Sequence, residues 1–430
     1  MAEQMKPSGI DWIGDIPKSW KVTRLQTLFD QVKDKNSGTK EKNLLSLSYG
    51  KIVKKDIEGA FGLIPESFDT YNIIKKNDIV LRLTDMQNDQ VSLRTGLVKE
   101  EKGIITSAYV TIRLKCGSPS YYHWYLYAFD TSKQIYAFGQ GVRQSLTFEE
   151  LKKMLILLPS PKEQQAIADF LDEECAQIDS IAADLEKQIV LLQQYKKSLI
   201  TETVTKGLDK SAPMKDSGVE WIGKIPEHWQ KTRIKFEASI IGSGTTPDSG
   251  NSMYYDNGEH SWIQSGDLYG KDYIYETEKQ LTNLAILECH ALNWYTKDFV
   301  VVAMYGASVG NVAISKIDSF TNQACCVIKL NEKNDNRYLF YFLKAAQEEM
   351  LLKAFGGTQP NISQIIIKNL NFLNVPLLEQ IEIADFLDSK CDMINEMLKS
   401  KKDQYDILIK HKKSLIYEYV TGKKRVKEVR

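Results

Sequence analysis

The sequence predicts an α+β protein built as a tandem repeat, in which two globular domains are separated by two long helices that pair as an antiparallel coiled coil. Three observations predict this organisation. Sequence blocks recur in the same order in both halves of the 430-residue chain. Two stretches of about forty residues carry a heptad seam and contain no internal proline or glycine. The connections around these stretches are short, which determines the direction of each helix.

The repeat rests on three matched blocks, and such internal repeats decide an architecture before any local pattern does. Residues 8–20 return as 217–229, 167–172 return as 383–388, and 196–200 return as 412–416. The offset is 209 residues for the first block (221 − 12) and 216 for the other two (384 − 168). Between the blocks the two copies differ. The order is therefore variable region, common region, variable region, common region.

The common regions are predicted to be long helices. Apolar residues recur at alternating steps of four and three from Leu171 and from Leu387, with a polar lapse at Lys196. Pro161 precedes the first stretch, and Gly207 and Gly422 follow the two stretches, as expected at helix boundaries. Each helix should measure about 60–65 Å. The alternative is two amphipathic helices packed separately on their own domains, but helices this long with a seam usually pair.

The connections predict an antiparallel pair. Residues 158–161 join the first variable region directly to the start of the first helix, and a short segment joins that helix to Trp221. The second variable region therefore lies near the far end of the first helix, and the second helix starts there and runs back. The expected parts are a first domain over 1–157, a first helix over 158–208, a second domain over 209–374, and a second helix with a basic tail over 375–430. A pseudo-twofold relation between the halves follows.

Composition narrows the class of protein. Hydrophobic residues make up 43% and charged residues 26%, which is typical of a globular chain. No signal peptide or membrane span is expected, and six cysteines without a CxxC pair predict no metal site and a cytoplasmic location. The formal net charge is zero, with 56 basic and 56 acidic residues. A neutral balance counts mildly against a nucleic-acid binder, although a local basic face remains compatible with it.

The repeated SGxxWIGxIPxxW opening, the EQxxIAxFLD helix start and the KKSLIxExVT helix end resemble type I restriction–modification specificity subunits. Segments 242–247, 261–268, 304–310 and 357–363 add to the resemblance, and 141–147 matches more loosely. The resemblance covers nearly the whole chain. It implies two target-recognition domains, each reading half of a split, asymmetric sequence in double-stranded DNA. It also implies helices that dock two adenine-N6 methyltransferase subunits, with restriction subunits that supply the motor and nuclease.

The resemblance further implies that this chain is not an enzyme and holds no cofactor. S-adenosylmethionine, ATP and magnesium are expected on the partner subunits. The motifs fit this division: the sequence has no Pro-Pro pair for a methyltransferase motif, no GxxxxGK[ST] loop and no HExxH. The alternative function is a coiled-coil adaptor that joins other proteins without reading DNA.

Candidate DNA contacts lie in polar, glycine-rich parts of the variable regions, because arginine suits guanine and amides suit adenine. The candidates are Arg82, Gln87, Asn88, Arg94, Arg143 and Gln144 in the first domain, and Ser243, Thr245, Thr246, Tyr305, Ser308, Gln359 and Asn361 in the second. Three lysines, 51, 54 and 55, suit phosphates.

Aromatic residues have a different expected role. The runs at 121–127 and 338–343 are predicted to be helices that bury one face in a core. Trp12 and Trp221 are expected to anchor the segment that joins each domain to the helices. The basic tail after Gly422 is expected to be a frayed, solvated end.

Overall fold

The computed structural model describes residues 4–55, 67–86, 93–137, 145–355 and 360–426. The chain divides into two compact units, one formed by Met1–Glu186 with Lys402–Arg430 and the other by Lys187–Lys401. Each unit therefore holds part of each long helix together with one globular domain. Their mutual placement, including the pseudo-twofold relation, stays a prediction.

The two long helices are α4 (Pro161–Lys206, 46 residues) and α10 (Leu377–Val420, 44 residues). Pro161 is the first residue of α4, where its missing amide hydrogen costs nothing. Gly207 and Gly422 follow the helices with φ of +73°, the left-handed conformation that ends a helix. The residues that the sequence analysis took as boundary signals therefore stand at the ends of the two helices.

The predicted seam is confirmed by burial. Leu171, Cys175 and Ile178 of α4 are at most 5% exposed, and each seam position beyond them is buried or half-buried. The same pattern runs along α10 from Leu387.

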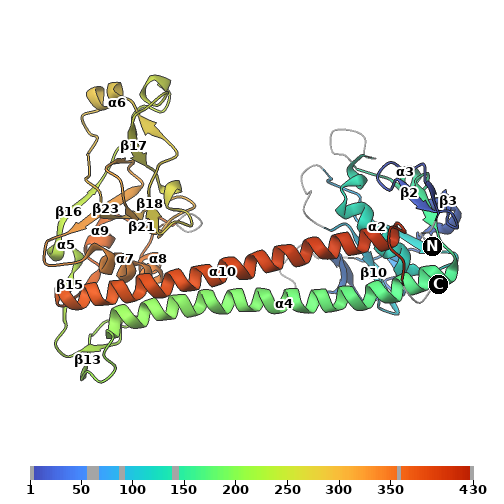
Figure 1. The fold of residues 1–430 in the computed structure, drawn as a ribbon, viewed down its shortest axis with the longest axis horizontal. Helices are drawn as coiled ribbons and strands as arrows, with labels where there is room; N and C mark the ends of the chain where they lie inside the picture. The colour runs from blue at the N-terminus through green and yellow to red at the C-terminus, as the bar shows by residue number, and fades with distance from the viewer. Residues whose placement is uncertain (1–3, 56–66, 87–92, 138–144, 356–359, 427–430) are drawn as a thin grey trace. The chain divides into compact units, whose positions relative to one another are not determined.

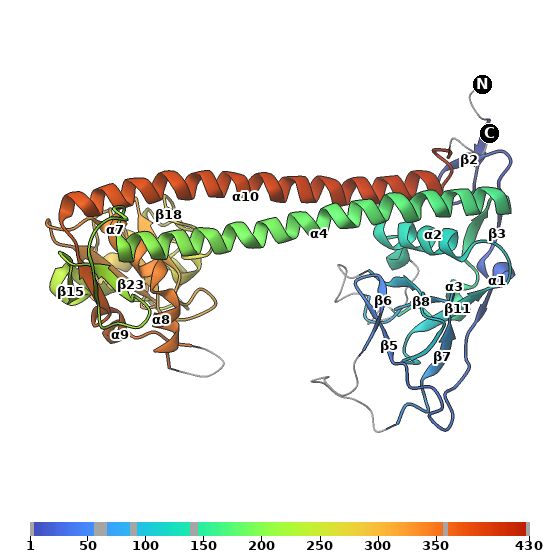
Figure 2. The same ribbon diagram turned by 90° about the horizontal axis from the view of Figure 1, so that it is seen from below.

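Each unit shows that the helices are antiparallel (Figures 1 and 2). In the first unit, the start of α4 shares a core with Leu415 and Val420 at the end of α10. In the second unit, Val204 at the end of α4 shares a core with Ile383 and Leu387 at the start of α10. The alternative of separately packed helices is therefore wrong.

The polar residue Lys196 interrupts the apolar seam for a structural reason. Its ammonium donates to Asn395 Oδ1 of α10 at 2.8 Å in the second unit. In the first unit the repeat-equivalent Lys412 donates to Asp179 Oδ1 of α4 at 2.5 Å. Each lysine thus meets a polar partner on the opposite helix, as a buried ammonium requires.

The first domain is built on a four-stranded antiparallel sheet of order β4-β11-β8-β9, with β3 paired to β12 beside it. Separate pairs β5-β6 and β7-β10 carry a smaller core. The elements are β1 (Met5–Pro7), β2 (Asp15–Pro17), β3 (Lys21–Arg24), α1 (Leu25–Leu28), β4 (Phe29–Gln31), β5 (Leu45–Ser48), β6 (Lys51–Lys54), β7 (Asn72–Lys75), β8 (Ile79–Leu81), β9 (Thr95–Leu97), β10 (Lys102–Ile105), β11 (Val110–Leu114), α2 (Pro119–Thr131), η1 (Gln134–Ala137), α3 (Phe148–Leu151) and β12 (Leu155–Leu158).

The second domain repeats this sheet as β16-β23-β20-β21 and extends it by β18, which pairs in parallel with β21. Strands β19-β17-β22 form an additional sheet, and Figure 1 shows α6 and β17 at the end of the domain remote from α10. The elements are β13 (Met214–Asp216), β14 (Lys224–Pro226), β15 (Gln230–Arg233), α5 (Ile234–Glu237), β16 (Ala238–Ser243), η2 (Ser252–Tyr254), β17 (His260–Ile263), η3 (Ser265–Leu268), β18 (Tyr273–Ile274), β19 (Gln280–Leu281), α6 (Asn283–Glu288), β20 (Phe299–Ala303), β21 (Val312–Ser315), β22 (Phe320–Thr321), β23 (Cys325–Leu330), α7 (Asn336–Ala345), α8 (Gln347–Leu352), α9 (Gln364–Lys368) and β24 (Asn371–Asn374).

The aromatic runs form the cores, as predicted. Tyr121 and Tyr122 of α2 are at most 1% exposed, and Tyr338, Phe340 and Phe342 of α7 are fully buried. None of these rings is available for stacking on a base.

The two predicted tryptophan anchors are also confirmed. Trp12 packs on Tyr125 of α2 and on Tyr417 of α10, with ring centroids 5.8 and 6.1 Å apart. Trp221 packs on Phe342 of α7 at 5.4 Å.

The start of the basic tail differs from the expected frayed end. Lys423 Nζ donates to the Asp15 carbonyl at 2.6 Å, and Arg425 pairs with Glu163 at the start of α4. These contacts hold the tail against the first unit because both cations find acceptors there.

Candidate nucleic-acid interface

Several loops of the second domain converge at one end of its main sheet. Thr245 N donates to the Thr321 carbonyl at 3.1 Å, and Asn322 N donates to the Ile263 carbonyl at 2.9 Å. These bonds join the loops that follow β16, β22 and β17. We call the surface formed by residues 243–246, 264–266, 305–308, 322–323 and 361 the loop cluster.

Two further bonds bring the remaining loops into the cluster. Met304 N donates to the Ala324 carbonyl, and Ile362 N donates to the Met304 carbonyl, both at 2.7 Å. The loop after β20 is therefore fixed between the loop before β23 and the loop before α9. Backbone bonds place all five segments, so the cluster presents side chains from a rigid base.

Close packing in the cluster depends on Gly244. A Cβ at this position would lie 1.6 Å from the Thr321 carbonyl oxygen, so no other residue fits. Gly306 has a φ of +88°, the left-handed region that favours glycine, and residues 306 and 307 are exposed at the surface.

Most of the second-domain candidates meet in the cluster. Thr245, Thr246 and Tyr305 are half-buried and Asn361 is exposed. Ser243 ends β16, and its carbonyl accepts a hydrogen bond from the Tyr295 hydroxyl at 3.3 Å. The cluster adjoins a surface depression of about 760 Å³ lined in part by Thr246 and Gln264.

Two second-domain candidates have a different outcome. Ser308 is only 5% exposed, so little of its side chain reaches the surface. A DNA contact there stays a prediction. Gln359 lies outside the described residues.

Sequence reasoning missed Gln323. Its side chain is exposed and its Oε1 accepts a hydrogen bond from the Thr246 hydroxyl. The available signal was the Asn-Gln pair at 322–323 between two buried strands, β22 and β23, because polar residues there must occupy a turn.

The first domain has a loop held in the same way. Arg82 N donates to the Arg94 carbonyl and Leu146 N donates to the Leu83 carbonyl, both at 2.8 Å. In the second domain Ala303 with Asn311, and Met304 with Ile362, make the matching bonds. Arg82 is half-buried, and Gln87, Asn88, Arg143 and Gln144 lie outside the described residues.

Arg94 is a correction to the candidate set. It is fully buried, and its guanidinium donates to the carbonyls of Arg82, Thr84 and Asp85 at 3.2, 2.9 and 3.2 Å. Its Nε also donates to the Tyr136 hydroxyl at 3.2 Å. Arg94 therefore shapes the loop after β8 from inside and cannot reach a base edge.

The lysines proposed for phosphates lie on the β5–β6 hairpin. Lys51 is 3.7 Å from Asp179 of α4, and its side chain is 72% exposed. A pair this exposed contributes little to stability. Lys54 and Lys55 are exposed.

Each domain is fixed to the start of a long helix by repeated carboxylates. Trp20 Nε1 donates to Glu163 at 3.1 Å, and Trp229 Nε1 donates to Glu379 at 3.0 Å. The first domain is also bonded to the end of the other long helix, because the Tyr121 hydroxyl of α2 donates to the Val420 carbonyl of α10 at 3.0 Å.

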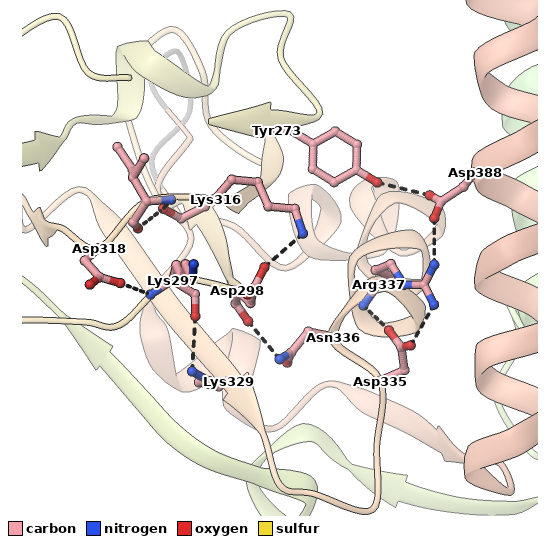
Figure 3. Close-up of polar contacts among 12 residues, drawn as sticks. Tyr273, Lys297, Asp298, Lys316, Asp318, Lys329, Asp335, Asn336, Arg337 and Asp388 are labelled. Atoms are coloured by element: carbon pink, nitrogen blue, oxygen red, sulfur yellow. Dashed lines mark hydrogen bonds and ion pairs between the residues drawn. The ribbon is translucent and has the colours of Figure 1, made fainter. Parts of the chain in front are cut away.

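A second pair of repeated carboxylates lies further along the helices. Asp172 accepts hydrogen bonds from Trp124 Nε1 and Ser120 Oγ, at 2.7 and 2.9 Å. The equivalent carboxylate in the second unit, Asp388, accepts from Tyr273 and Arg337 (Figure 3).

Among the described residues, no helix is long and apolar enough to cross a membrane, and no group of three or more metal-binding side chains gathers.

The fold defines a class of protein: two globular domains with a related sheet, each packed on the start of one long helix and the end of the other. The family model described as the type I restriction modification DNA specificity domain matches the chain twice, over residues 17–190 and 226–404. The chain belongs to this family. Sequence-specific DNA recognition follows from that membership, and nothing supports the adaptor alternative.

Relatives of similar length agree with this assignment. The chain is 26% identical over 435 residues to the type I restriction enzyme MjaX specificity subunit of Methanocaldococcus jannaschii, with 96% of each chain covered. It is 24% identical over 427 residues to the MjaVIII specificity subunit of the same organism, covering 96% of this chain and 95% of the relative.

Solved structures share the fold. A chain from work on complex assembly and conformational transition of the type I R-M system superimposes with a TM-score of 0.70 at 14% identity, covering 94% of this chain and 98% of that one. The HsdS subunit from Thermoanaerobacter tengcongensis gives 0.50 at 14% identity, covering 95% and 98%.

Proposed function

We propose that this chain gives a type I restriction–modification complex its DNA target and performs no chemistry itself. Each recognition domain reads one half of a split, asymmetric sequence in double-stranded DNA. One observation carries the proposal: the loops after β8 and β20 are held by the same backbone bonds on the same frame, through Leu83 with Leu146 and Met304 with Ile362. The same placement of two loops that differ in sequence is what two readers of different half-sites require.

The chemistry of the loop cluster suits base edges. Thr245, Thr246, Gln323 and Asn361 offer hydroxyl and amide groups without net charge. Amides can bond adenine bidentately, and hydroxyls can donate to or accept from any base. Neutral groups of this kind discriminate between bases, whereas lysines supply the sequence-independent attraction to phosphates.

The helices supply the docking surfaces for two adenine-N6 methyltransferase subunits. Exposed apolar residues recur at equivalent positions, 216 residues apart: Ile181 with Met397 and Leu191 with Ile407 are 49% to 65% exposed. Scattered exposed apolar residues are ordinary, but recurrence at matched positions in both copies favours two similar partner surfaces. Restriction subunits complete the assembly, and S-adenosylmethionine, ATP and magnesium bind to these partners.

Binding of the complex with its methyltransferase partners to DNA tests the proposal. The target is first identified from the modified adenines of the host genome. Gln323→Ala should weaken binding to the intact target about tenfold, because a base-edge contact is worth about 1–3 kcal/mol. Gln230→Ala, an exposed glutamine on β15 outside the loop cluster, serves as the control and should bind as wild type. Equal binding to target and scrambled duplexes by the wild-type complex would overturn the proposal.

A further inference from the structure

One short segment of the second domain engages both long helices. The Asp272 carboxylate lies 3.5 Å from Lys196 Nζ of α4 and also pairs with Lys344 of α7. The next residue, Tyr273, donates its hydroxyl to Asp388 Oδ1 of α10 at 3.0 Å (Figure 3). We call Asp272 and Tyr273 the clamp. Because neighbouring residues bind two different helices, the clamp cannot slide along either one without losing a contact.

The α10 end of the clamp is well anchored. Besides Tyr273, Asp388 accepts from the Tyr341 hydroxyl at 2.7 Å and from Arg337 Nη1 at 3.0 Å. Hydrogen bonds to an ionised carboxylate are the strong ones. Burial, together with the hydrogen bond to Asp388, raises the pKa of both tyrosines, so each stays a neutral donor.

The clamp belongs to a closed segment that carries part of the loop cluster. Asp267 accepts from Gln264 N at 2.8 Å and from Glu278 N at 3.1 Å, which ties together the two ends of residues 264–278. Leu268 and Ile274 are at most 1% exposed and lie in one core cluster. A displacement at the clamp therefore reaches residues 264–266 through packed and bonded structure.

Within the described part of the first domain, no segment is a counterpart of residues 264–278. The main sheet of this domain ends at β9, and the equivalent carboxylate Asp172 receives donors only from Ser120 and Trp124 of α2 among the described residues. The second unit thus has a segment, residues 264–278, that connects the long helices to the loop cluster.

We propose that Asp272 and Tyr273 are positioning residues for reading the second half-site. They hold residues 264–278 against the helices, so that the 264–266 edge of the loop cluster meets DNA at a fixed place. The assignment rests on the proposed function, because it takes the second domain as the reader of one half-site.

Two matched variants separate positioning from stability. Tyr273→Phe and Tyr341→Phe each remove one hydroxyl from the same carboxylate and keep the ring, which for Tyr273 stacks on Phe340 with centroids 6.1 Å apart. Only Tyr273 lies in the segment that carries loop-cluster residues. Both variants should therefore lower the melting temperature, whereas only Tyr273→Phe should alter recognition.

The experiment measures binding of the methyltransferase-containing complex to three duplexes: the intact target, and targets with the first or the second half-site scrambled. Tyr273→Phe should reduce discrimination at the second half-site about five- to tenfold, which is the size expected for the loss of one hydrogen bond. Discrimination at the first half-site should not change, and Tyr341→Phe should match wild type at both.

Equal loss of discrimination in both variants, loss at both half-sites, or no loss in Tyr273→Phe would overturn the positioning role. A wild-type complex that cannot distinguish a scrambled second half-site would instead overturn the proposed function, so the two failures give different results.

Discussion

The two recognition domains share a frame that packs on the long helices and differ in the strands that each adds to that frame. Both bury an aromatic helix, α2 or α7, against the helix pair and bond a tryptophan to a carboxylate at the helix start. Beyond the shared four strands, the first domain adds two strand pairs and the second adds β18 and a three-stranded sheet. The repeated part therefore meets the repeated helices. The divergent part also reaches them at Lys51 of β6 and at the clamp residues Asp272 and Tyr273, and its remaining strands are free to follow two different DNA half-sites.

Gly244 provides the test of this comparison with the largest expected effect. Gly244→Ala should destabilise the second unit by about 3 kcal/mol, because the added methyl overlaps the Thr321 carbonyl. The first unit should keep its stability. Hydrogen exchange read peptide by peptide distinguishes the units, and Gly266→Ala, where a Cβ meets nothing within 4 Å, is the control. Equal destabilisation of both units would contradict the independence of the divergent parts.

A matched pair of buried tyrosines tests the shared part. Tyr121 and Tyr338 each donate to the carbonyl of a last-turn residue of a long helix, Val420 or Val204, at 3.0 Å. Replacing either with phenylalanine leaves a buried carbonyl without its donor and should cost about 1–2 kcal/mol in its own unit. Chemical denaturation of both variants should give equal losses. Clearly unequal losses would show that the two equivalent hydrogen bonds do not contribute equally to the stability of the two units.

The smallest expected effect is a pH dependence at Glu163. Burial raises the pKa of its carboxyl, but hydrogen bonds from Ser160 and Trp20 and the nearby Arg425 charge hold the pKa below its ordinary 4.5. A lowered folded-state pKa stabilises the fold above the unfolded value, and this contribution is lost as pH falls through the folded value. Below about pH 4.5 wild type should therefore lose stability more steeply than Glu163→Gln. Parallel melting curves from pH 6 to about pH 3 would refute this sign.

Much of the frame could be predicted because its signals are periodic and local. Residue patterns that repeat over short stretches of sequence predict the seam from Leu171, the helix boundary at Pro161 and the aromatic helices. Antiparallel pairing followed from connection lengths alone.

The DNA-contacting site was harder to predict, because the same type of side chain can contact a base at the surface or support a loop from inside the domain. Arginine reads guanine at a surface, but Arg94 binds three carbonyls inside the domain, and nothing local distinguishes the two uses. Ser308 in a glycine-rich segment is buried. The bond between Tyr273 and Asp388 joins residues 115 apart, a pairing that no sequence pattern encodes.

The most direct test of the central claim is domain exchange. Residues from about Thr23 to Leu158, which run from β3 to β12, are replaced by the equivalent region of another family member, and the methylated motif is read from modified adenines. The account predicts that one half-site changes while the other keeps its sequence. A motif in which both half-sites change together would contradict independent reading by the two domains.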